Sequence, residues 1–157
     1  MNKEILCQNL IVKEIDMIST KINNKWVKIK NKIFSKVSRI FANSSEIDIE
    51  ITLDINTEIY PIHEEDKFEL KLLSINIVEK NSKNNDQDWK EYFDKKLIEN
   101  YEYVMFGTIF HCGFEDKNFF IYGSFGGLLL KIFGGLDLLS YRKFYVDSKI
   151  LLLIKKI

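Results

Sequence analysis

The chain has 157 residues, of which 46% are hydrophobic and 13% aromatic, which is enough for one well-filled core and predicts a single domain over residues 1–157. Its 23 Lys and Arg residues balance its 23 Asp and Glu residues, which excludes the strongly basic composition of a dedicated nucleic-acid-binding domain. No apolar stretch approaches the roughly 20 residues of a membrane-spanning helix, and the N-terminal residues lack the apolar core of an export signal.

Charge is distributed unevenly along the chain. Residues 21–39 hold seven Lys or Arg and no acid, whereas residues 46–69 hold nine acids and one Lys. A neutral total therefore hides a basic segment and an acidic one. The two cysteines, Cys7 and Cys112, lie far apart in apolar segments, which favours two reduced thiols inside a cell over a disulfide framework.

Eight segments have the composition of β-strands. The clearest one contains residues 46–57, where Ile and Leu alternate strictly with other residues, so that one face of the strand is buried and the other is wet. Strands with one buried face and one solvent-exposed face are typical of antiparallel sheets. Many short strands separated by turns indicate a sandwich or a barrel. The eight segments are residues 4–15, 34–41, 46–56, 67–78, 101–112, 117–125, 127–134 and 146–155.

Two segments do not read as barrel strands. Residues 17–36 mix lysines with large apolar residues and fit a basic amphipathic hairpin or a helix about equally well. Residues 79–100 begin with nine residues of strong turn chemistry, 79–87, which predict a mobile loop. In the following residues, 88–99, three apolar side chains recur every four positions and predict one short helix.

The ionisable residues do not combine into a catalytic or metal site. His63 and His111 are isolated from any pattern with the spacing of metal ligands or of a nucleophile and its base. The acids at 64–66 follow a proline and favour a solvated turn over a catalytic carboxylate pair. We therefore expect no catalytic residue, no metal and no cofactor.

Two surfaces suit binding. Gly123, Gly126 and Gly127 lack the spacing of a phosphate loop and instead predict a barrel corner or a place where another backbone approaches. The lysine-rich segment contains Trp26 and is suited to binding phosphates and stacking a base, although a solvated loop is the commoner outcome of a charge run. The candidate nucleic-acid contacts are Lys21, Lys25, Trp26, Lys28, Lys30, Lys32, Lys36 and Arg39.

Six segments, in order, resemble the common subunit, eighth in the numbering, that eukaryotic RNA polymerases I, II and III share. Residues 5–16 are also similar to the family's opening segment. The six segments are VSRI (37–40), ITLDINTEIYPI (51–62), DKFEL (66–70), YEYVMFG (101–107), SFGGLLLKI (124–132) and VDSKILLLIKK (146–156).

The resemblance implies an all-β fold, an eight-stranded antiparallel barrel related to the OB fold. It also implies a non-catalytic, structural subunit in the nucleus, which docks on the largest polymerase subunits and their neighbours and supports DNA-templated transcription. Apolar and glycine positions suit the centre of such an interface. The candidate docking residues are Tyr103, Met105, Gly126, Gly127, Leu128 and Leu129.

The family also implies a weak, sequence-independent affinity for single-stranded DNA in the region after its first strand, here about residues 16–51. The alternative function is a free-standing, single-stranded nucleic-acid-binding OB-fold protein, in which the lysines would matter more than the glycines. The chain departs from the family pattern at residues 17–36, which are longer and richer in lysine than the usual connection, so the resemblance implies no conformation there. It also has Phe125 where the family typically has tyrosine.

Overall fold

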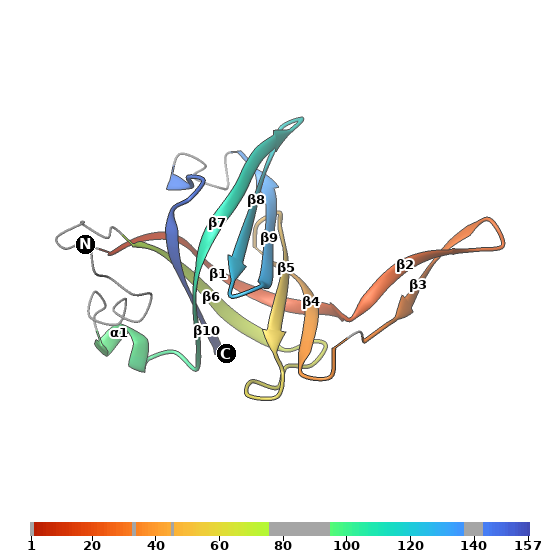
Figure 1. Ribbon diagram of the computed structural model, residues 1–157, viewed down its shortest axis with the longest axis horizontal. Coiled ribbons are helices and arrows are strands. Elements are labelled where there is room, and N and C mark those ends of the chain that lie inside the picture. The colour runs from red at the N-terminus through yellow and green to blue at the C-terminus, as the bar shows by residue number, and fades with distance from the viewer. Residues whose placement is uncertain (1, 33, 45, 76–94, 137–142) are drawn as a thin grey trace.

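The computed structural model describes residues 2–32, 34–44, 46–75, 95–136 and 143–157, which form strands and one short helix (Figure 1). The strands before the helix are β1 (Asn2–Ile15), β2 (Met17–Ile22), β3 (Lys25–Lys30), β4 (Val37–Ser44), β5 (Ile49–Asn56) and β6 (Lys67–Ile75). They are followed by α1 (Lys95–Glu99), β7 (Tyr103–Glu115), β8 (Asn118–Phe125), β9 (Leu128–Gly135) and β10 (Lys149–Lys156).

Eight strands close into an antiparallel barrel in the order β1-β4-β5-β9-β8-β7-β10-β6, which confirms the fold expected from the sequence. Strand β1 closes the barrel because it pairs with two neighbours: Asn2 to Ile11 pair with β6, and Leu10 to Ile15 pair with β4. The register shifts in both ladders, as it does at a β-bulge, and such irregularities bend a strand so that it follows the curvature of the wall. The geometry is consistent with a relation to the OB fold.

The core of the barrel consists of the side chains that point inward from alternate positions of each strand. In β5, the side chains of Ile49, Ile51, Leu53 and Ile55 are at most 1% exposed, as the sequence predicted. The outward positions between them are wetter, with one exception: Asp54 is only 7% exposed although it points away from the core. That exception belongs to the site described below.

A second, smaller apolar cluster lies outside the barrel wall. Strand β10 is buried on both faces: Ile150, Leu152 and Ile154 belong to the core, and Leu151 and Leu153 belong to the outer cluster. Leu97 and Ile98 of α1 pack against this outer cluster, and Figure 1 shows α1 at that side of the barrel. An apolar run without alternation therefore marks a strand that is covered from both sides.

The helix α1 contains the last residues of the predicted helical segment. The rest of that segment, and the predicted mobile loop at 79–87, lie outside the described residues.

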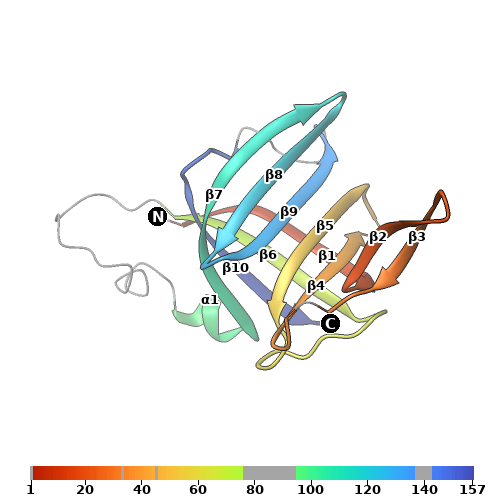
Figure 2. The same ribbon diagram turned by 45° about the vertical axis from the view of Figure 1, so that its right-hand side comes forward.

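Residues 17–30 form an antiparallel hairpin, β2 and β3, which decides between the hairpin and the helix that the sequence left open. The hairpin turns at Asn23 and Asn24, whose φ angles are 50° and 63°. Two consecutive residues with positive φ are the requirement of a type I′ hairpin turn, and asparagine tolerates that conformation well. The hairpin projects from one end of the barrel as a two-stranded ribbon (Figures 1 and 2).

The packing between β7 and β8 yields a test of the barrel geometry. A Cβ atom added at Gly107 would overlap the carbonyl oxygen of Ser124 and the ring of Phe125, so G107A should lower the free energy of unfolding by about 1–3 kcal/mol. At Gly123, an added Cβ would have ordinary contacts of 3.6–3.7 Å, and G123A should be as stable as the wild type or slightly more stable. Urea unfolding of the two variants measures the difference, and equal stabilities would contradict this packing.

Candidate functional site

The hinge between the barrel and the hairpin is built around Asp16. This residue has a φ of 55° and lies between the end of β1 and the start of β2. Its backbone N–H donates to the carbonyl oxygen of Arg39 at 2.8 Å, and its Oδ1 accepts from the backbone N–H of Arg39 at 3.0 Å. Its own carbonyl oxygen accepts from the N–H of Asn31 at 2.7 Å. One residue thus ties both ends of the hairpin to β4.

A bidentate ion pair forms the floor of the hinge. The Arg39 guanidinium donates from Nε to Oδ1 of Asp54 at 2.7 Å and from Nη2 to Oδ2 at 3.1 Å. The same Oδ2 accepts, at 3.0 Å, from the backbone N–H of Leu129, the second residue of β9, which follows the turn between β8 and β9. Paired, charge-assisted hydrogen bonds of this kind are the strong ones, and here they raise the pKa of Arg39 above its ordinary value while burial opposes the rise.

A pocket of about 360 Å³ lies between the hairpin base and this turn. Gly126 and Gly127 form one wall with φ angles of 61° and 96°, which favour glycine, and an added Cβ at either would have no atom within 4 Å. The pocket is lined by Asp16, Met17, Ile18, Asn31, Phe34, Val37, Arg39, Asp54, Gly126, Gly127 and Leu128. Both acids of the lining are bonded to Arg39, Asp54 through the guanidinium and Asp16 through the backbone N–H. The rest of the lining is mainly apolar, so the pocket suits an apolar group.

The predicted docking residues fall into two places. Gly126, Gly127 and Leu128 line the pocket, and the neighbouring Leu129 is 40% exposed. Tyr103 and Met105 lie elsewhere, in or against the barrel core. The Tyr103 side chain is 6% exposed, and its hydroxyl accepts from the backbone N–H of Asn56 at 3.2 Å. Docking through any of these six residues stays a prediction.

The basic residues of the hairpin are arranged by the strand register. Lys21 is directly opposite Trp26, and Lys28 and Lys30 lie opposite Ser19 and Met17 on the same face. The Trp26 side chain is 74% exposed. The ribbon therefore has one face that carries three lysines and an exposed aromatic ring.

The other predicted nucleic-acid contacts lie apart from that face. Lys25 is opposite Ile22 on the reverse face of the ribbon, Lys32 follows β3 and is exposed, and Arg39 is held by Asp54. Two lysines form exposed ion pairs: Lys28 with Glu14 at 2.7 Å, and Lys36 with Glu58 at 3.5 Å. The contact of these residues with nucleic acid stays a prediction.

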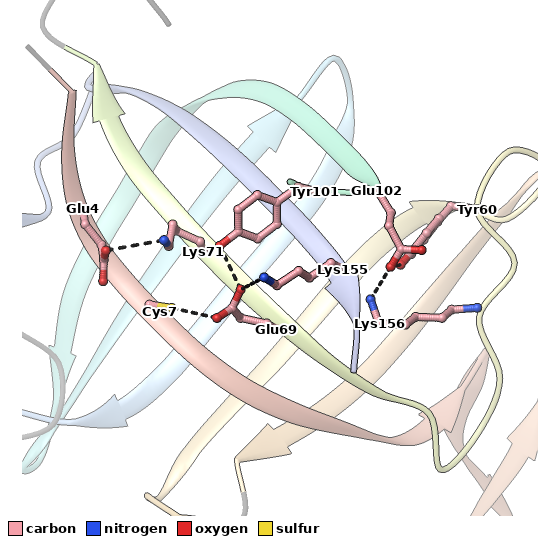
Figure 3. Close-up of polar contacts among 9 residues, drawn as sticks. All are labelled: Glu4, Cys7, Tyr60, Glu69, Lys71, Tyr101, Glu102, Lys155 and Lys156. Carbon is pink, nitrogen blue, oxygen red and sulfur yellow. Dashed lines mark hydrogen bonds and ion pairs between the residues drawn. The ribbon is translucent and has the colours of Figure 1, made fainter. Parts of the chain in front are cut away.

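A polar network crosses the outer surface of β1, β6 and β10 (Figure 3). The Glu69 carboxylate accepts from the Tyr101 hydroxyl at 2.8 Å and from the Cys7 thiol at 3.6 Å, and it pairs with Lys155 at 3.5 Å. Partial burial acts to raise the pKa of Glu69, but the Tyr101 hydrogen bond and the Lys155 charge outweigh it, so the pKa lies below its usual value. Burial and the nearby Glu69 raise the pKa of Cys7, which keeps this thiol protonated.

The neighbouring Glu102 joins two more segments. It accepts from the Tyr60 hydroxyl at 3.2 Å and from the backbone N–H of Lys156, as Figure 3 shows. Burial, followed by the charge of Glu102, raises the pKa of Tyr60 to about 12. Tyr101 and Glu102 thus tie the segment that follows α1 to the barrel wall, so these hydrogen bonds have a structural role.

Neither a metal centre nor a membrane helix is found in the part of the chain that the structure describes. Within those residues, no three His, Cys, Asp or Glu side chains are grouped as metal ligands. Of the helical residues described there, none belongs to a helix long and apolar enough to cross a membrane.

Asp16, Phe34 and Asp54 are site residues that the sequence analysis missed. Asp54 occupies an outward position of an alternating strand, where the sequence pattern predicts a solvent-exposed side chain. The only available signal was the opposite charge of Arg39, and its pairing with Asp54 depends on a strand register that the sequence does not display.

The barrel and its apolar pocket define a small all-β, OB-like barrel with a surface suited to binding. The chain belongs to the RNA polymerase Rpb8 family, whose family model matches residues 21–156, and this confirms the resemblance seen in the six segments.

Relatives in several eukaryotes carry polymerase names. The chain is 33% identical over 137 residues to the "Probable DNA-directed RNA polymerases I, II, and III subunit RPABC3" of Caenorhabditis briggsae, covering 84% of this chain and 90% of that protein. It is 36% identical over 113 residues to the Schizosaccharomyces pombe subunit RPABC3, covering 71% and 74%. It is 32% identical over 134 residues to "DNA-directed RNA polymerases II, IV and V subunit 8B" of Arabidopsis thaliana, covering 80% and 86%.

The hinge yields a stability test. D54A removes the partner of Arg39 and of the Leu129 N–H, and loss of these part-buried bonds should lower the free energy of unfolding by about 1–3 kcal/mol. The matched control is E58A, which removes the exposed ion pair with Lys36 and should change stability by about 0–1 kcal/mol. Urea unfolding measures both variants. A D54A protein as stable as E58A would show that the ion pair does not support the hinge.

Proposed function

We propose that this chain is the subunit shared by RNA polymerases I, II and III and that it acts there as a structural component without chemistry of its own. The observation that carries the proposal is the family match over residues 21–156, together with relatives that bear the name of the shared subunit in nematodes and yeast. Eukaryotic polymerases of these classes transcribe nuclear DNA, so we expect the chain in the nucleus.

The proposal of a non-catalytic role is supported by the state of the ionisable groups. In the pocket, Arg39 and Asp54 form a bidentate ion pair with each other. In the outer network, the Cys7 thiol has a raised pKa and is therefore a poor nucleophile at neutral pH. A nucleophile needs an activating base and an oriented partner, and neither cluster supplies that combination.

We assign docking on the largest polymerase subunits to the glycine turn and its surroundings. Gly126 and Gly127 leave the backbone bare, Leu128 lines the adjacent pocket, and Leu129 exposes 40% of its surface. Bare backbone beside apolar side chains allows a close, dry contact, which is typical of an interface core. Tyr103 and Met105 act in this proposal by supporting the wall from the core.

Purification of the tagged chain from its own cells, in moderately high salt, tests this function. We expect the largest subunits of polymerases I, II and III in comparable amounts by mass spectrometry. L129D places a charge on the proposed interface and should reduce recovery by about tenfold or more, since a buried unpaired charge is costly. I59D, at a side chain that is 69% exposed, is the matched control and should change nothing. A wild-type chain that recovers no polymerase would refute the proposal.

A second function is supported by the basic face of the hairpin: weak, sequence-independent binding of single-stranded nucleic acid. Lys21 and Trp26 form a cross-strand pair, and Lys28 and Lys30 lie on the same face. Lysines that follow a phosphate backbone beside a ring that stacks on a base are the usual elements of such binding. This function is compatible with the subunit role, and without that role it describes a free-standing OB-fold protein.

Salt dependence distinguishes the two elements of this face. We expect the chain to bind oligo(dT) weakly, with an affinity that falls as salt rises. K21S should reduce the slope of log affinity against log salt by about 0.7, the contribution of one phosphate contact on a single strand. W26A should weaken binding without changing the slope, because stacking releases no counterion. K117S, at an exposed lysine beyond the barrel's β7, is the control; the proposal fails if it has the same effect as K21S.

A further inference from the structure

The hairpin is the sheet of the described structure that ends in free strand edges. Among the strands that the structure describes, β2 and β3 pair only with each other, whereas every strand of the barrel has a neighbour on both sides. The hairpin also stands away from the barrel, which leaves its edges accessible (Figure 2). A free edge exposes backbone N–H and C=O groups with which another extended chain can pair, and a third strand would stabilise a hairpin that is marginally stable alone.

The strand register shows which backbone groups point outward. The N–H of Asn31 donates to the carbonyl oxygen of Asp16 at 2.7 Å, so these two opposite residues form a hydrogen-bonded pair. Bonded and non-bonded pairs alternate along an antiparallel ladder, and the turn closes on a further bonded pair, Ile22 and Lys25. The pairs between them direct their backbone groups away from the ribbon. These outward residues are Met17, Ser19 and Lys21 on β2 and Trp26, Lys28 and Lys30 on β3.

The two free edges differ in their protection against a further strand. Strand β3 carries three lysines among its six residues, whereas β2 carries one. Lysines along an edge strand oppose the addition of another strand, and natural sheets use them for that purpose. The middle of β2 consists of Ser19 and Thr20, which are short and uncharged. The edge of β2 is therefore the one that can accept a partner.

The β2 edge lies on the same side as the glycine turn. Met17 and Ile18, at the base of β2, line the hinge pocket together with Gly126 and Gly127. The base of β3 belongs to another pocket, in which Lys30 lies with residues of the loop between β5 and β6. A chain that pairs with β2 therefore ends, beside Met17, next to the turn to which docking is assigned above.

The two faces of the ribbon determine the side-chain pattern of a partner strand. Opposite residues share a face, so Ile18 and Ile29 lie with Val27 on one face, and Lys21 and Lys28 lie on the other. A strand added at β2 extends both faces, and its side chains alternate between them. We expect such a strand to have apolar residues at every second position, on the face of Ile18, and polar residues between them.

Two other occupants fit this edge less well. Single-stranded DNA offers phosphate oxygens to the outward N–H groups, but its backbone has no donor for the outward carbonyl oxygens. A second copy of this chain, paired β2 to β2 in antiparallel orientation, would place the lysine faces of both hairpins on one side of a common sheet. Like charges on adjacent strands are destabilising, which opposes that pairing.

We propose that the free edge of β2 takes an extended segment of a neighbouring polymerase subunit as a third strand, paired through the outward backbone groups of Met17, Ser19 and Lys21. The proposal rests on the subunit role proposed above, and it adds a main-chain contact to the docking at the glycine turn. In this mode of recognition, main-chain hydrogen bonds supply affinity and the alternating side chains supply specificity.

Proline substitutions on the two edges test the pairing. S19P and K28P change residues that lie directly opposite each other, and neither N–H belongs to the ladder of the hairpin, so both variants keep β2 paired with β3. S19P should lower the amount of polymerase retained after a high-salt wash by about tenfold, because it removes a donor and places a ring in the path of the added strand. K28P obstructs the other edge and should retain polymerase as the wild type does.

The outcomes separate this proposal from the subunit role. If the unsubstituted chain retains no polymerase, the subunit role fails and the added strand fails with it. If S19P retains as much polymerase as the wild type, or if S19P and K28P lose it equally, the subunit role stands and the added strand is overturned.

Amide hydrogen exchange tests the same edge without any substitution. The outward amides of Ser19 and Lys21 should exchange at least about tenfold more slowly in the assembled polymerase than in the free chain, because hydrogen-bonded amides exchange only when the pairing opens. The outward amides of Trp26 and Lys28 on β3 are the control and should exchange equally fast in both. Unchanged exchange on β2, or equal slowing on both strands, would contradict the proposal.

Photocrosslinking identifies the added strand. Thr20, whose side chain lies on the face of Ile18, is replaced by p-benzoylphenylalanine in the tagged chain. After irradiation of cells and purification, mass spectrometry should find the adduct in one segment of a polymerase subunit that has apolar residues at alternate positions. Adducts only with nucleic acid, adducts only with another copy of this chain, or no adduct would overturn the proposal.

Discussion

The carboxylate of Asp54 holds three parts of the molecule together, and the shape of the pocket beside the hairpin depends on it. It is only 7% exposed, it accepts two hydrogen bonds from Arg39 on β4, and it accepts a third from Leu129 at the start of β9, next to the β8–β9 turn. Asp16 continues the connection from Arg39 into the hairpin. Because a part-buried carboxylate must keep its partners, the positions of the turn and the hairpin base are coupled, and the pocket between them keeps its shape.

The outer surface of the barrel is covered over β6 and β10 but exposes apolar side chains near the hairpin. Over β6 and β10, α1 covers an apolar cluster, and Tyr101 and Glu102 fasten the chain to the wall. On the side of the hairpin, apolar side chains are left at the surface around a pocket. The closed barrel wall has no free strand edge, whereas the two-stranded sheet of the hairpin is not closed.

The electrostatics follow from where acids and bases find partners. Several acids of residues 46–69 have partners on the outside of the barrel: Asp54 pairs with Arg39, Glu69 pairs with Lys155, and Asp66 accepts from the N–H of His63. The lysines of the hairpin, in contrast, are mainly exposed to solvent. A chain without net charge thereby acquires a positively charged projection, whose field reaches a distance of about one Debye length, roughly 10 Å at moderate salt.

The sequence by itself determined the eight barrel strands, the inward face of β5 and the family, because side-chain alternation has the period of the strand and the six segments keep their order. It left residues 17–36 undecided, since strands of six residues are too short for periodicity to separate them from a helix; the turn at Asn23 and Asn24 was the unused signal. Only the tertiary structure decided that Arg39 meets Asp54, that Tyr103 lies in the core and that one face of the hairpin is apolar. The reason is that these contacts depend on the register of paired strands, and register is set by the closure of the whole barrel.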